Sequence, residues 1–265
     1  MLYLVGTPIG NLKDITGRAL ETLAAVDYIA CEDTRHSGMM LNHYGIKKPL
    51  ISYYKHREQE SSERILGLLK EGKNVAIISD AGMPCISDPG SVLVAKAREE
   101  GCEICVIPGP SAVVSAVTLA GISGGFVFLE FLAEKTKDRK AQLEPFINSP
   151  LPLVMYCSPH DLDKTLNYLS ETLGDRKLQI VKEITKIYEG VEITTLAIGT
   201  QRDKKGEYVL IVEGKDNKFC TDLSVEDQLI ELMGSGLCKK DAIKKVAEQR
   251  KVKKDDIYKI AINIK

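Results

Sequence analysis

Hydrophobic residues along the first 120 positions form short apolar runs separated by longer amphipathic stretches. The runs have the length and residue types of buried strands, and they lie at residues 1–5, 28–31, 50–52, 74–79 and 103–107. The stretches between them repeat apolar residues every three or four positions, and they lie at residues 14–25, 34–44, 58–70, 89–100 and 110–119. This alternation of strand and helix predicts a mostly parallel sheet with helices on its faces.

Two of the predicted helices are expected to begin at an aspartate. Asp14 has a side chain that accepts hydrogen bonds from the free N–H groups of a helix start. Asp88 stands directly before Pro89, which is favoured at the first helical position. Both residues are therefore predicted to be helix caps.

The pattern changes at residues 121–125. Further strands are predicted at 126–132, 153–157, 178–183, 189–197 and 208–213, and helices at 138–147 and 162–173. The last three strands are closely joined, which favours antiparallel pairs. A polar stretch at 214–220 precedes a capping pair, Ser224 with Asp227, and then helices at 239–249 and 255–262. We therefore predict an N-terminal α/β domain at 1–120, a C-terminal α/β domain at 121–216 and a small basic helical extension at 222–265.

Composition excludes several classes of protein. The 265 residues are 44% hydrophobic and 28% charged, with a formal net charge of −1, so neither disorder nor a globally basic nucleic-acid binder is indicated. No apolar run approaches the ~20 residues of a membrane helix, and the N-terminus lacks the basic start of a signal peptide. The seven cysteines lie mostly in apolar runs, which favours reduced thiols in the cytoplasm, and no metal site is expected.

Three loops rich in glycine and proline follow predicted strands, at residues 6–11, 78–90 and 107–112. Ligands of α/β sheets bind beyond the carboxyl ends of strands, so one shared site is expected. Neither the G-x-G-x-x-G pattern nor the P-loop Gly-Lys-Ser/Thr is present. Each loop alone is typical of a structural turn, whereas the three together indicate an adenosine-like ligand held by rigid backbone groups. Asp80 is expected at the edge of this crevice, or else as a turn-capping residue.

Four ordered motifs resemble one known family. They are Leu2-Tyr-Leu-Val-Gly-Thr-Pro-Ile-Gly-Asn-Leu-Lys-Asp-Ile-Thr16, Cys31-Glu-Asp-Thr-Arg-His36, Ser79-Asp-Ala-Gly-Met-Pro-Cys-Ile-Ser-Asp-Pro-Gly90 and Ile107-Pro-Gly-Pro-Ser-Ala112. These segments are similar to the ribosomal RNA small-subunit methyltransferase I family, a branch of the tetrapyrrole (corrin/porphyrin) methylases. Residues 237–248 and 257–259 resemble the family's C-terminal extension, so the resemblance covers nearly the whole chain.

The resemblance implies a fold, a methyl donor and a substrate. The implied fold is tetrapyrrole-methylase-like, with two α/β domains, the cofactor cleft between them and a small helical C-terminal extension. The implied reaction is 2′-O-methylation of a cytidine ribose in the decoding region of 16S rRNA by S-adenosylmethionine. A homodimer that acts on the small ribosomal subunit is also implied. The motif match places the donor against Thr7, Pro8, Ile9, Gly10, Asp80, Ala81, Gly82, Met83, Pro110, Ser111 and Ala112.

Five positions depart from the family pattern. Met83 replaces a usual Thr, whereas Cys85 and Glu130 replace usual glycines. Cys157 and Asp161 replace an acid and a base in a segment that should face the crevice. These changes leave target choice and catalytic competence open.

A ribose hydroxyl needs in-line positioning and a base for its proton. Glu32, Asp33 and Arg35 form the densest group of suitable side chains, with helix capping and a surface ion pair as the alternative. Lys186 matches a family lysine and is suited to hold phosphate or, with a lowered pKa, to act as base. A solvated lysine at a strand end is the alternative there.

The basic charge is concentrated at the C-terminal end. Residues 236–265 contain ten Lys or Arg and four Asp or Glu, which fits contact with RNA phosphates. A solvated amphipathic bundle is the alternative. Further candidate phosphate contacts are Lys55, Arg57, Lys135, Lys137, Arg139 and Lys140. The competing functions are methylation of a tetrapyrrole or another small acceptor, and a non-catalytic role in binding RNA or the ribosome.

Overall fold

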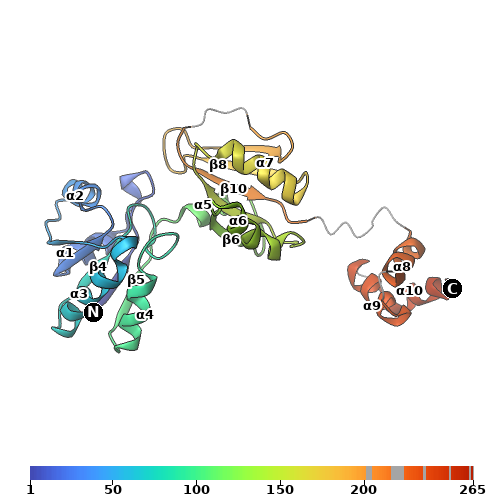
Figure 1. Cartoon of the computed structure of the whole chain (residues 1–265), viewed down its shortest axis with the longest axis horizontal. Coiled ribbons are helices and arrows are strands. Elements are labelled where there is room, and N and C mark those ends of the chain that lie inside the picture. Colours follow the sequence, from blue (N-terminus) through green and yellow to red (C-terminus); the bar gives the residue numbers. More distant parts are fainter. Residues whose placement is uncertain (201–204, 216–223, 235–236, 251, 263, 265) are drawn as a thin grey trace. The chain divides into compact units, whose positions relative to one another are not determined.

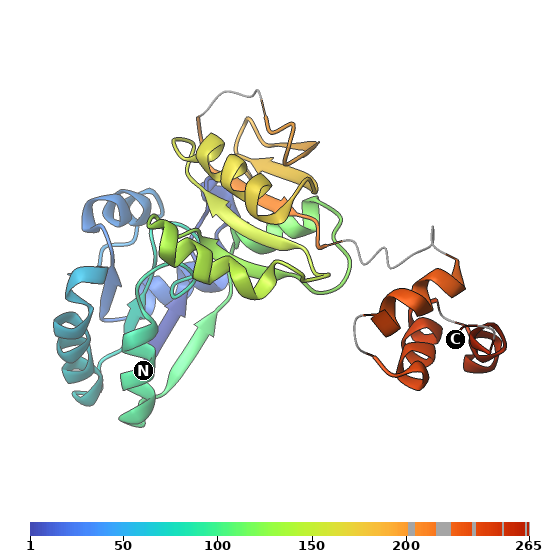
Figure 2. The same ribbon diagram turned by 45° about the vertical axis from the view of Figure 1, so that its right-hand side comes forward.

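The computed structural model describes residues 1–200, 205–215, 224–234, 237–250, 252–262 and 264. The chain forms two compact units, Met1–Glu213 and Gly214–Lys265 (Figure 1). The first unit contains two β-sheets, which Figure 2 shows from a second direction. The predicted domain boundary near residue 120 falls between the strands of these sheets and stays a prediction.

The first sheet is parallel throughout and has the order β3-β2-β4-β1-β5. Its strands are β1 (Leu2–Val5), β2 (Tyr28–Cys31), β3 (Leu50–Ser52), β4 (Val75–Ile77) and β5 (Ile104–Ile107). In the register of β1, Leu2 lies beside Val75 of β4 on one side and Ile104 of β5 on the other. The strands are short and apolar because both faces of the sheet are covered. The prediction of a parallel sheet is confirmed.

Helices form a core on each face of this sheet. They are α1 (Gly17–Ala25), α2 (Thr34–His43), α3 (Glu58–Lys70) and α4 (Ser91–Glu99), with the 3₁₀ turns η1 (Leu12–Asp14) and η2 (Lys55–Arg57). Leu23 of α1 and Leu41 of α2 pack in one core. Leu69 of α3 and Leu93 of α4 pack in the other.

Two helices begin differently from the prediction. Asp14 lies in η1, and Thr16 caps α1 by accepting a hydrogen bond from the Ala19 N–H at 3.1 Å. The helix α4 begins after Gly90, whose φ of 137° suits glycine, and no side chain caps it. The predicted caps at Asp14 and Asp88 are therefore wrong, because the backbone turns into each helix two residues later. Both carboxylates are left for other contacts.

The second sheet is mixed and has the order β6-β7-β10-β8-β9. Its strands are β6 (Val127–Phe131), β7 (Leu153–Cys157), β8 (Lys177–Lys182), β9 (Gly190–Thr195) and β10 (Tyr208–Val212). The β6–β7 pair is parallel, and the other three pairs are antiparallel, as predicted. The helices α6 (Thr136–Leu143) and α7 (Leu162–Leu173) and the turn η3 (Glu144–Phe146) complete this part of the chain, and α6 and α7 share a core with the sheet.

The helix α5 (Ala112–Leu119) follows the first sheet in sequence but packs on the second. Val113 and Val117 share a core with Val154 of β7 and Val209 of β10. The loop before α5 thus runs from a strand of one sheet to a helix of the other. This path brings the carboxyl end of β5 close to the second sheet.

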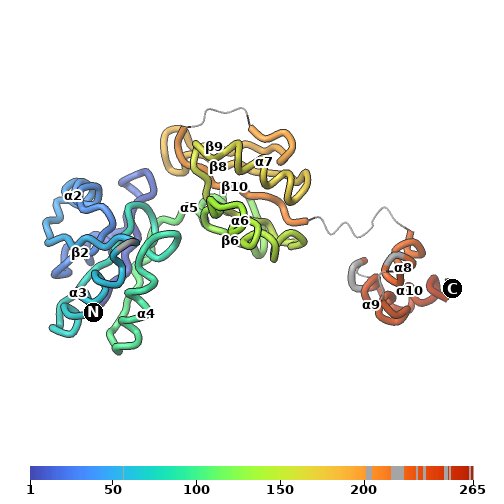
Figure 3. The backbone as a smooth tube through the Cα atoms, in the orientation of Figure 1, coloured from blue at the N-terminus to red at the C-terminus, as the bar shows by residue number. Residues whose placement is uncertain are grey.

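The second unit contains the helices α8 (Val225–Gly234), α9 (Lys239–Arg250) and α10 (Lys254–Ala261), whose path Figure 3 traces. Their common core includes Leu229, Leu232, Ala242, Val246 and Ile257. The Ser224 hydroxyl accepts a hydrogen bond from the Asp227 N–H at 3.0 Å, as the capping pair predicts. Most of the predicted linker, and residues 222–223 of the predicted extension, lie outside the described residues. No helix in the described ranges is long and apolar enough to cross a membrane.

Candidate functional site

The three loops rich in glycine and proline meet inside the first unit. Thr7 and Gly82 exchange two backbone hydrogen bonds, with N–O distances of 2.9 and 3.2 Å. The buried Thr7 hydroxyl donates to the Ser79 carbonyl oxygen at 3.1 Å. A Cβ on Gly6 would lie 2.8 Å from the Gly109 Cα, so the first and third loops touch where neither has a side chain. Only glycine permits so close an approach of two backbones.

A cavity of about 480 Å³ opens beside the meeting point of the loops. Its wall includes Asp88 of the second loop, Ser111 of the third loop, Tyr156 of β7 and Glu207 just before β10. Residues of both sheets therefore line one cavity. The expectation that the loops share a site is consistent with this geometry.

Most residues assigned to the donor line this cavity. They are Ile9, Asp80, Ala81, Gly82, Met83, Ser111 and Ala112. Thr7, Pro8, Gly10 and Pro110 were assigned to the donor too but do not line it, and Thr7 instead holds the second loop. The donor contacts stay predictions at the level of single residues.

The cavity wall is acidic. Glu32, Asp80, Asp88 and Glu207 line it, and the described residues of the wall include no Lys, Arg or His. Such a wall attracts a cationic ligand and repels a phosphate. S-adenosylmethionine carries a sulfonium, an ammonium and one carboxylate, so its net positive charge fits this wall. The buried Ser87 hydroxyl also lines the cavity and has no hydrogen-bond partner in the described structure, so it offers a polar contact to a ligand.

Two of these acids have altered acidity. Burial raises the pKa of the Asp88 carboxyl to about 6, and the carboxylates of Glu32 and Asp80 add to the rise. Burial and the Asp80 carboxylate also raise the pKa of Glu32. An acid with a pKa near 6 is mostly ionised at neutral pH and still basic enough to take a proton. The sequence analysis missed this role of Asp88, although its position in the second loop was a usable signal.

The motif at residues 31–36 is only partly directed to the cavity. Glu32 lines it, and the Asp33 N–H donates to Asp80 Oδ1 at 3.4 Å. The Asp33 carboxylate caps α2 by accepting hydrogen bonds from the N–H groups of Arg35 and His36, and these bonds lower its pKa. The Arg35 side chain is 91% exposed and pairs with Asp33 at 3.4 Å. These contacts match the structural alternative for Asp33 and Arg35, and a catalytic role for either stays a prediction.

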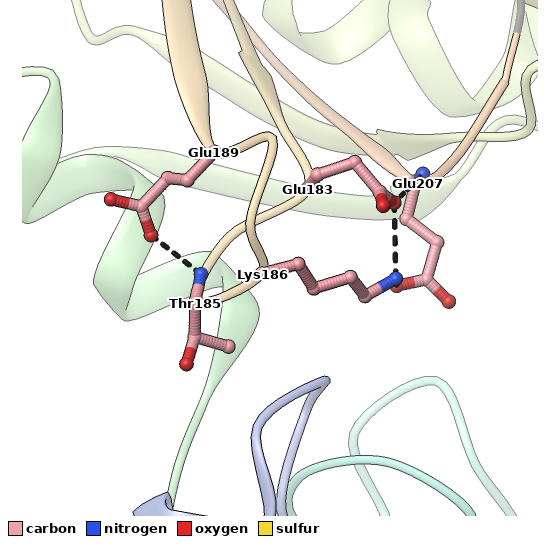
Figure 4. A network of polar contacts seen from close by, with 5 residues as sticks. All are labelled: Glu183, Thr185, Lys186, Glu189 and Glu207. Carbon is pink, nitrogen blue, oxygen red and sulfur yellow. Dashed lines mark hydrogen bonds and ion pairs between the residues drawn. The ribbon is translucent and has the colours of Figure 1, made fainter.

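Lys186 belongs to a polar network on the turn between β8 and β9 (Figure 4). Its Nζ lies 3.0 Å from Glu183 Oε1 and 3.0 Å from Glu207 Oε2. Burial opposes the charge on Lys186, but its hydrogen bonds to the two carboxylates outweigh burial and raise its pKa. The lowered pKa that base catalysis by Lys186 requires is therefore absent, whereas its charge is retained for positioning or phosphate contact.

The same turn is fastened to the first loop. A Cβ on Gly10 would lie 2.6–3.2 Å from three carbons of the Lys186 side chain, so the lysine stem packs against the bare glycine. The neighbouring Thr185 hydroxyl donates to the Asp14 carboxylate. Since Glu207 lines the cavity and holds Lys186, this network joins the first loop to the cavity wall.

Two departures from the family pattern have a backbone explanation. Cys85 and Glu130 have φ values of 70° and 57°, in the left-handed region that favours glycine. The strand pairing of β6 with β7 also shifts around Glu130. Met83 and Cys157 line the cavity, and burial raises the pKa of the Cys157 thiol to about 11, which keeps it neutral. Asp161 is exposed just before α7.

One candidate phosphate contact is buried. Arg139 donates to the carbonyl oxygens of Ala133 and Glu134 at 2.7 and 3.1 Å, and its guanidinium lies over the Tyr168 ring. The prediction that Arg139 binds RNA is therefore wrong, because its donors hold the start of α6. Lys135, Lys137 and Lys140 are exposed.

Comparison with known proteins agrees with the resemblance in the motifs. The profile of the Tetrapyrrole (Corrin/Porphyrin) Methylases matches residues 1–198. A protein of Haemophilus influenzae named Ribosomal RNA small subunit methyltransferase I is 42% identical, over 99% of this chain and 96% of that protein. A protein of the same name from Thermotoga maritima is 42% identical over 219 residues, which cover 81% of this chain and 99% of that protein. The crystal structure of the methyltransferase CobJ matches with a TM-score of 0.63 at 18% identity, over 81% of this chain and 94% of that chain, and confirms the expected fold.

Proposed function

The chain belongs to the tetrapyrrole (corrin/porphyrin) methylase family and, within it, to the ribosomal RNA small subunit methyltransferase I family, and we propose that it methylates the ribose 2′-oxygen of a cytidine in the decoding region of 16S rRNA. Family membership confirms the expected class, a methyltransferase, and the expected donor, S-adenosylmethionine. The acidic cavity at the junction of the three loops is the observation that carries the proposal for the site.

The loops provide a rigid seat for the donor. Bound S-adenosylmethionine supplies a methyl group already attached to a positively charged sulfur. Ile9, Met83 and Ala112 offer apolar contacts, and Asp80 accepts hydrogen bonds at the edge of the cavity. Rigid backbone contacts such as the Thr7–Gly82 bridge favour the in-line arrangement that methyl transfer needs.

Carboxylates of the wall take the proton of the ribose. As the 2′-oxygen forms its bond to the methyl carbon, its O–H bond breaks and the proton passes to a carboxylate oxygen of Glu32 or Asp88. Both groups line the cavity, and both have a raised pKa. Lys186 stays protonated and holds Glu207 in the wall, so it acts as a positioning residue.

RNA phosphates are held away from the acidic wall, because carboxylates repel them. Basic side chains elsewhere must therefore supply the affinity for RNA. The candidates are Lys55, Arg57, Lys135, Lys137, Lys140 and the basic residues of the helical unit. Binding through phosphates makes the affinity fall as the salt concentration rises.

A homodimer that acts on the small ribosomal subunit in the cytoplasm completes the proposal. An apolar surface around the edge strand β9 supports self-association, because Ile187, Tyr188, Ile193 and Ile198 are all exposed. In the described sheet β9 pairs only with β8 and is therefore an edge strand, a common place for contact between chains. Sedimentation analysis at micromolar concentration measures the oligomeric state. A monomer would contradict the homodimer but not the proposed reaction.

Mapping of 2′-O-methyl marks in 16S rRNA, with and without the protein, tests the reaction. We expect one cytidine of the decoding region to lose its mark in cells that lack the protein and regain it when the gene is restored. A change to Asp88→Asn together with Glu32→Gln should abolish restoration. An unaltered methylation map in cells without the protein would contradict the proposal.

The competing functions give different results in vitro. A tetrapyrrole methylase would shift the absorption spectrum of an added corrinoid or porphyrin and methylate it. A non-catalytic protein would bind the donor in calorimetry but transfer no labelled methyl group to small subunits. Transfer to RNA without any tetrapyrrole binding is the expected outcome.

A further inference from the structure

A basic groove lies on the helical unit, between α9 and α10. Its volume is about 600 Å³. Lys240 and Lys244 of α9 line it on one side. Lys254 and Tyr258 of α10 line it on the other, together with Ile262, which directly follows α10. Ile243 and Ala261, which are buried in the helical core, contribute to its floor.

Three lysines of this groove have no partner in the described part of the chain. No hydrogen bond or ion pair occupies the ammonium groups of Lys240, Lys244 or Lys254 among the described residues. By contrast, Lys239 donates to the Ile264 carbonyl oxygen at 2.6 Å, and Lys259, outside the groove, pairs with Asp256. Uncompensated ammonium groups that share one concave surface attract an anion with several charges.

The groove also holds two carboxylates. The Asp241 carboxylate contacts the Cys238 thiol at 3.0 Å, and Asp255 lies in the first turn of α10. With Lys239 included, four ammonium groups face two carboxylates, so the groove remains positive. This charge is opposite to that of the acidic cavity in the first unit.

An exposed aromatic ring stands among the lysines. The Tyr258 residue is 58% exposed, and the neighbouring Ile262 is 62% exposed. Neither side chain contributes to the buried core of the unit. Exposed aromatic rings beside basic residues are the usual platform for unstacked bases, since any base can stack on the ring while its phosphates meet the cations.

We propose that this groove binds a single-stranded segment of RNA, with phosphates on Lys240, Lys244 and Lys254 and a base stacked on Tyr258. The proposal rests on the proposed function, which makes RNA the substrate. It identifies a second RNA contact, chemically separate from the acidic cavity where the methyl group is transferred. Duplex RNA is excluded from the stacking contact because its bases are already stacked.

The groove is an accessory to catalysis. The alignment with the Thermotoga maritima relative is 219 residues long and covers 99% of that protein. That protein is therefore about as long as the unit Met1–Glu213 alone. A protein of that name can therefore exist at a length that leaves no room for the helical unit. Loss of the groove should accordingly raise the KM for RNA and leave kcat at saturating RNA nearly unchanged.

Fluorescence anisotropy with the full-length chain and a labelled single-stranded oligoribonucleotide of mixed sequence tests the proposal. The double variant Lys240→Ala with Lys244→Ala should weaken binding at low salt at least tenfold. It should also reduce the magnitude of the slope of log K against log salt by about 1.4, because each lost phosphate contact of a single strand contributes about 0.7. The double variant Lys245→Ala with Lys259→Ala is the control, because it removes the same amount of charge from the helical unit, one lysine from α9 and one from α10, at positions outside the groove. The control should weaken binding less than threefold.

Substitution of Tyr258 tests the stacking contact separately from the charge of the groove. Tyr258→Ala should weaken binding about fivefold or more, as expected for the loss of one stacked base, with an unchanged salt slope. Tyr258→Phe keeps the ring and should restore the affinity. Circular dichroism of each variant checks that the helices remain folded.

Calorimetry with S-adenosylmethionine measures donor binding, which depends on the cavity and not on the groove, so a failure of this proposal can be told apart from a failure of the proposed function. Equal losses in groove and control variants, or no loss in either, would overturn the groove while leaving methyl transfer intact. Unchanged RNA affinity with weaker binding to ribosomal proteins would assign the groove to a protein partner and likewise overturn it. A wild-type chain that binds the donor but neither the oligoribonucleotide nor small ribosomal subunits at low salt would instead contradict both proposals.

Discussion

Replacing Asp88 by asparagine should stabilise the protein while it removes activity. The Asp88 carboxylate lines the cavity among other acids, and burial followed by repulsion from Glu32 and Asp80 raises its pKa from 3.8 to about 6. At neutral pH the folded protein therefore holds an ionised group in an unfavourable environment. Asparagine has nearly the same shape and no charge, so it removes this strain.

The size of the effect follows from the shift in acidity. A rise of about two pKa units corresponds to about 3 kcal/mol if the group were fully shielded from solvent. Asp88 is only partly buried, and solvent screening reduces the expected gain to about 1–2 kcal/mol. The sign follows from proton binding, because an acid with a raised pKa in the folded state binds more protons when folded. Its favourable contribution is complete below about pH 4 and is lost as the pH rises through about 6.

Urea unfolding at pH 7 and at pH 3.5 measures this difference. We expect the Asp88→Asn midpoint to exceed the wild-type midpoint at pH 7, and the gap to close at pH 3.5, where the wild-type carboxyl is protonated. In single-turnover methyl transfer the variant should be about 10²-fold slower or more, the usual loss for a general base. Donor affinity from calorimetry should fall much less than the rate, because three other carboxylates of the wall remain.

Two results would refute the reasoning. An equal stability gain at both pH values would show that the charge of Asp88 is not responsible. Wild-type methyl transfer by Asp88→Asn would exclude this carboxylate as the proton acceptor and leave Glu32, which the matched variant Glu32→Gln tests in the same assays.

Three further substitutions probe the loops and the wall. Asp80→Ala should weaken donor binding about tenfold or more in calorimetry, since a charged hydrogen-bond acceptor of the cavity is lost, and an unchanged affinity would contradict its placement. Gly10→Ala should lower the free energy of unfolding by about 1–3 kcal/mol, because φ is 150° there and the Lys186 stem blocks a Cβ. Gly17→Ala is its control, since nothing lies within 4 Å, and equal losses in the two variants would refute the packing argument. Glu130→Gly should relieve a left-handed backbone, and it should lower the pKa of Asp88, because the Glu130 carboxylate repels the Asp88 carboxylate. The pH–rate profile of the variant should therefore shift to lower pH, and an unshifted profile would count against this coupling.

Local pattern predicted most elements of the chain. The predicted bounds at 58–70, 153–157 and 162–173 are those of α3, β7 and α7. Periodicity succeeds at these places because each element buries one continuous apolar face. The caps at Asp14 and Asp88 failed, since an aspartate caps a helix only where the backbone turns directly after it.

The site was predictable only in part. The loops and Glu32 carry local signals, in spacing and residue type, and they do line or border the cavity. Asp88 was missed although it lies in the second loop, because it was assigned to a helix cap, and Glu207 was missed because nothing in its neighbours along the chain indicates that it faces the cavity. Arg139 was assigned to RNA from its charge, but its burial depends on how α6 packs.

By itself the sequence determined the strand and helix alternation, the three loops, the family motifs and the basic C-terminal stretch, because these depend on residue type and short-range spacing. Tertiary structure alone decided that α5 packs on the second sheet and that Glu32, Asp88 and Glu207 share one wall. It also decided that Lys186 keeps its proton between two carboxylates. Acidity and ligand charge preference depend on distances through space between residues far apart in the chain, and folding sets those distances.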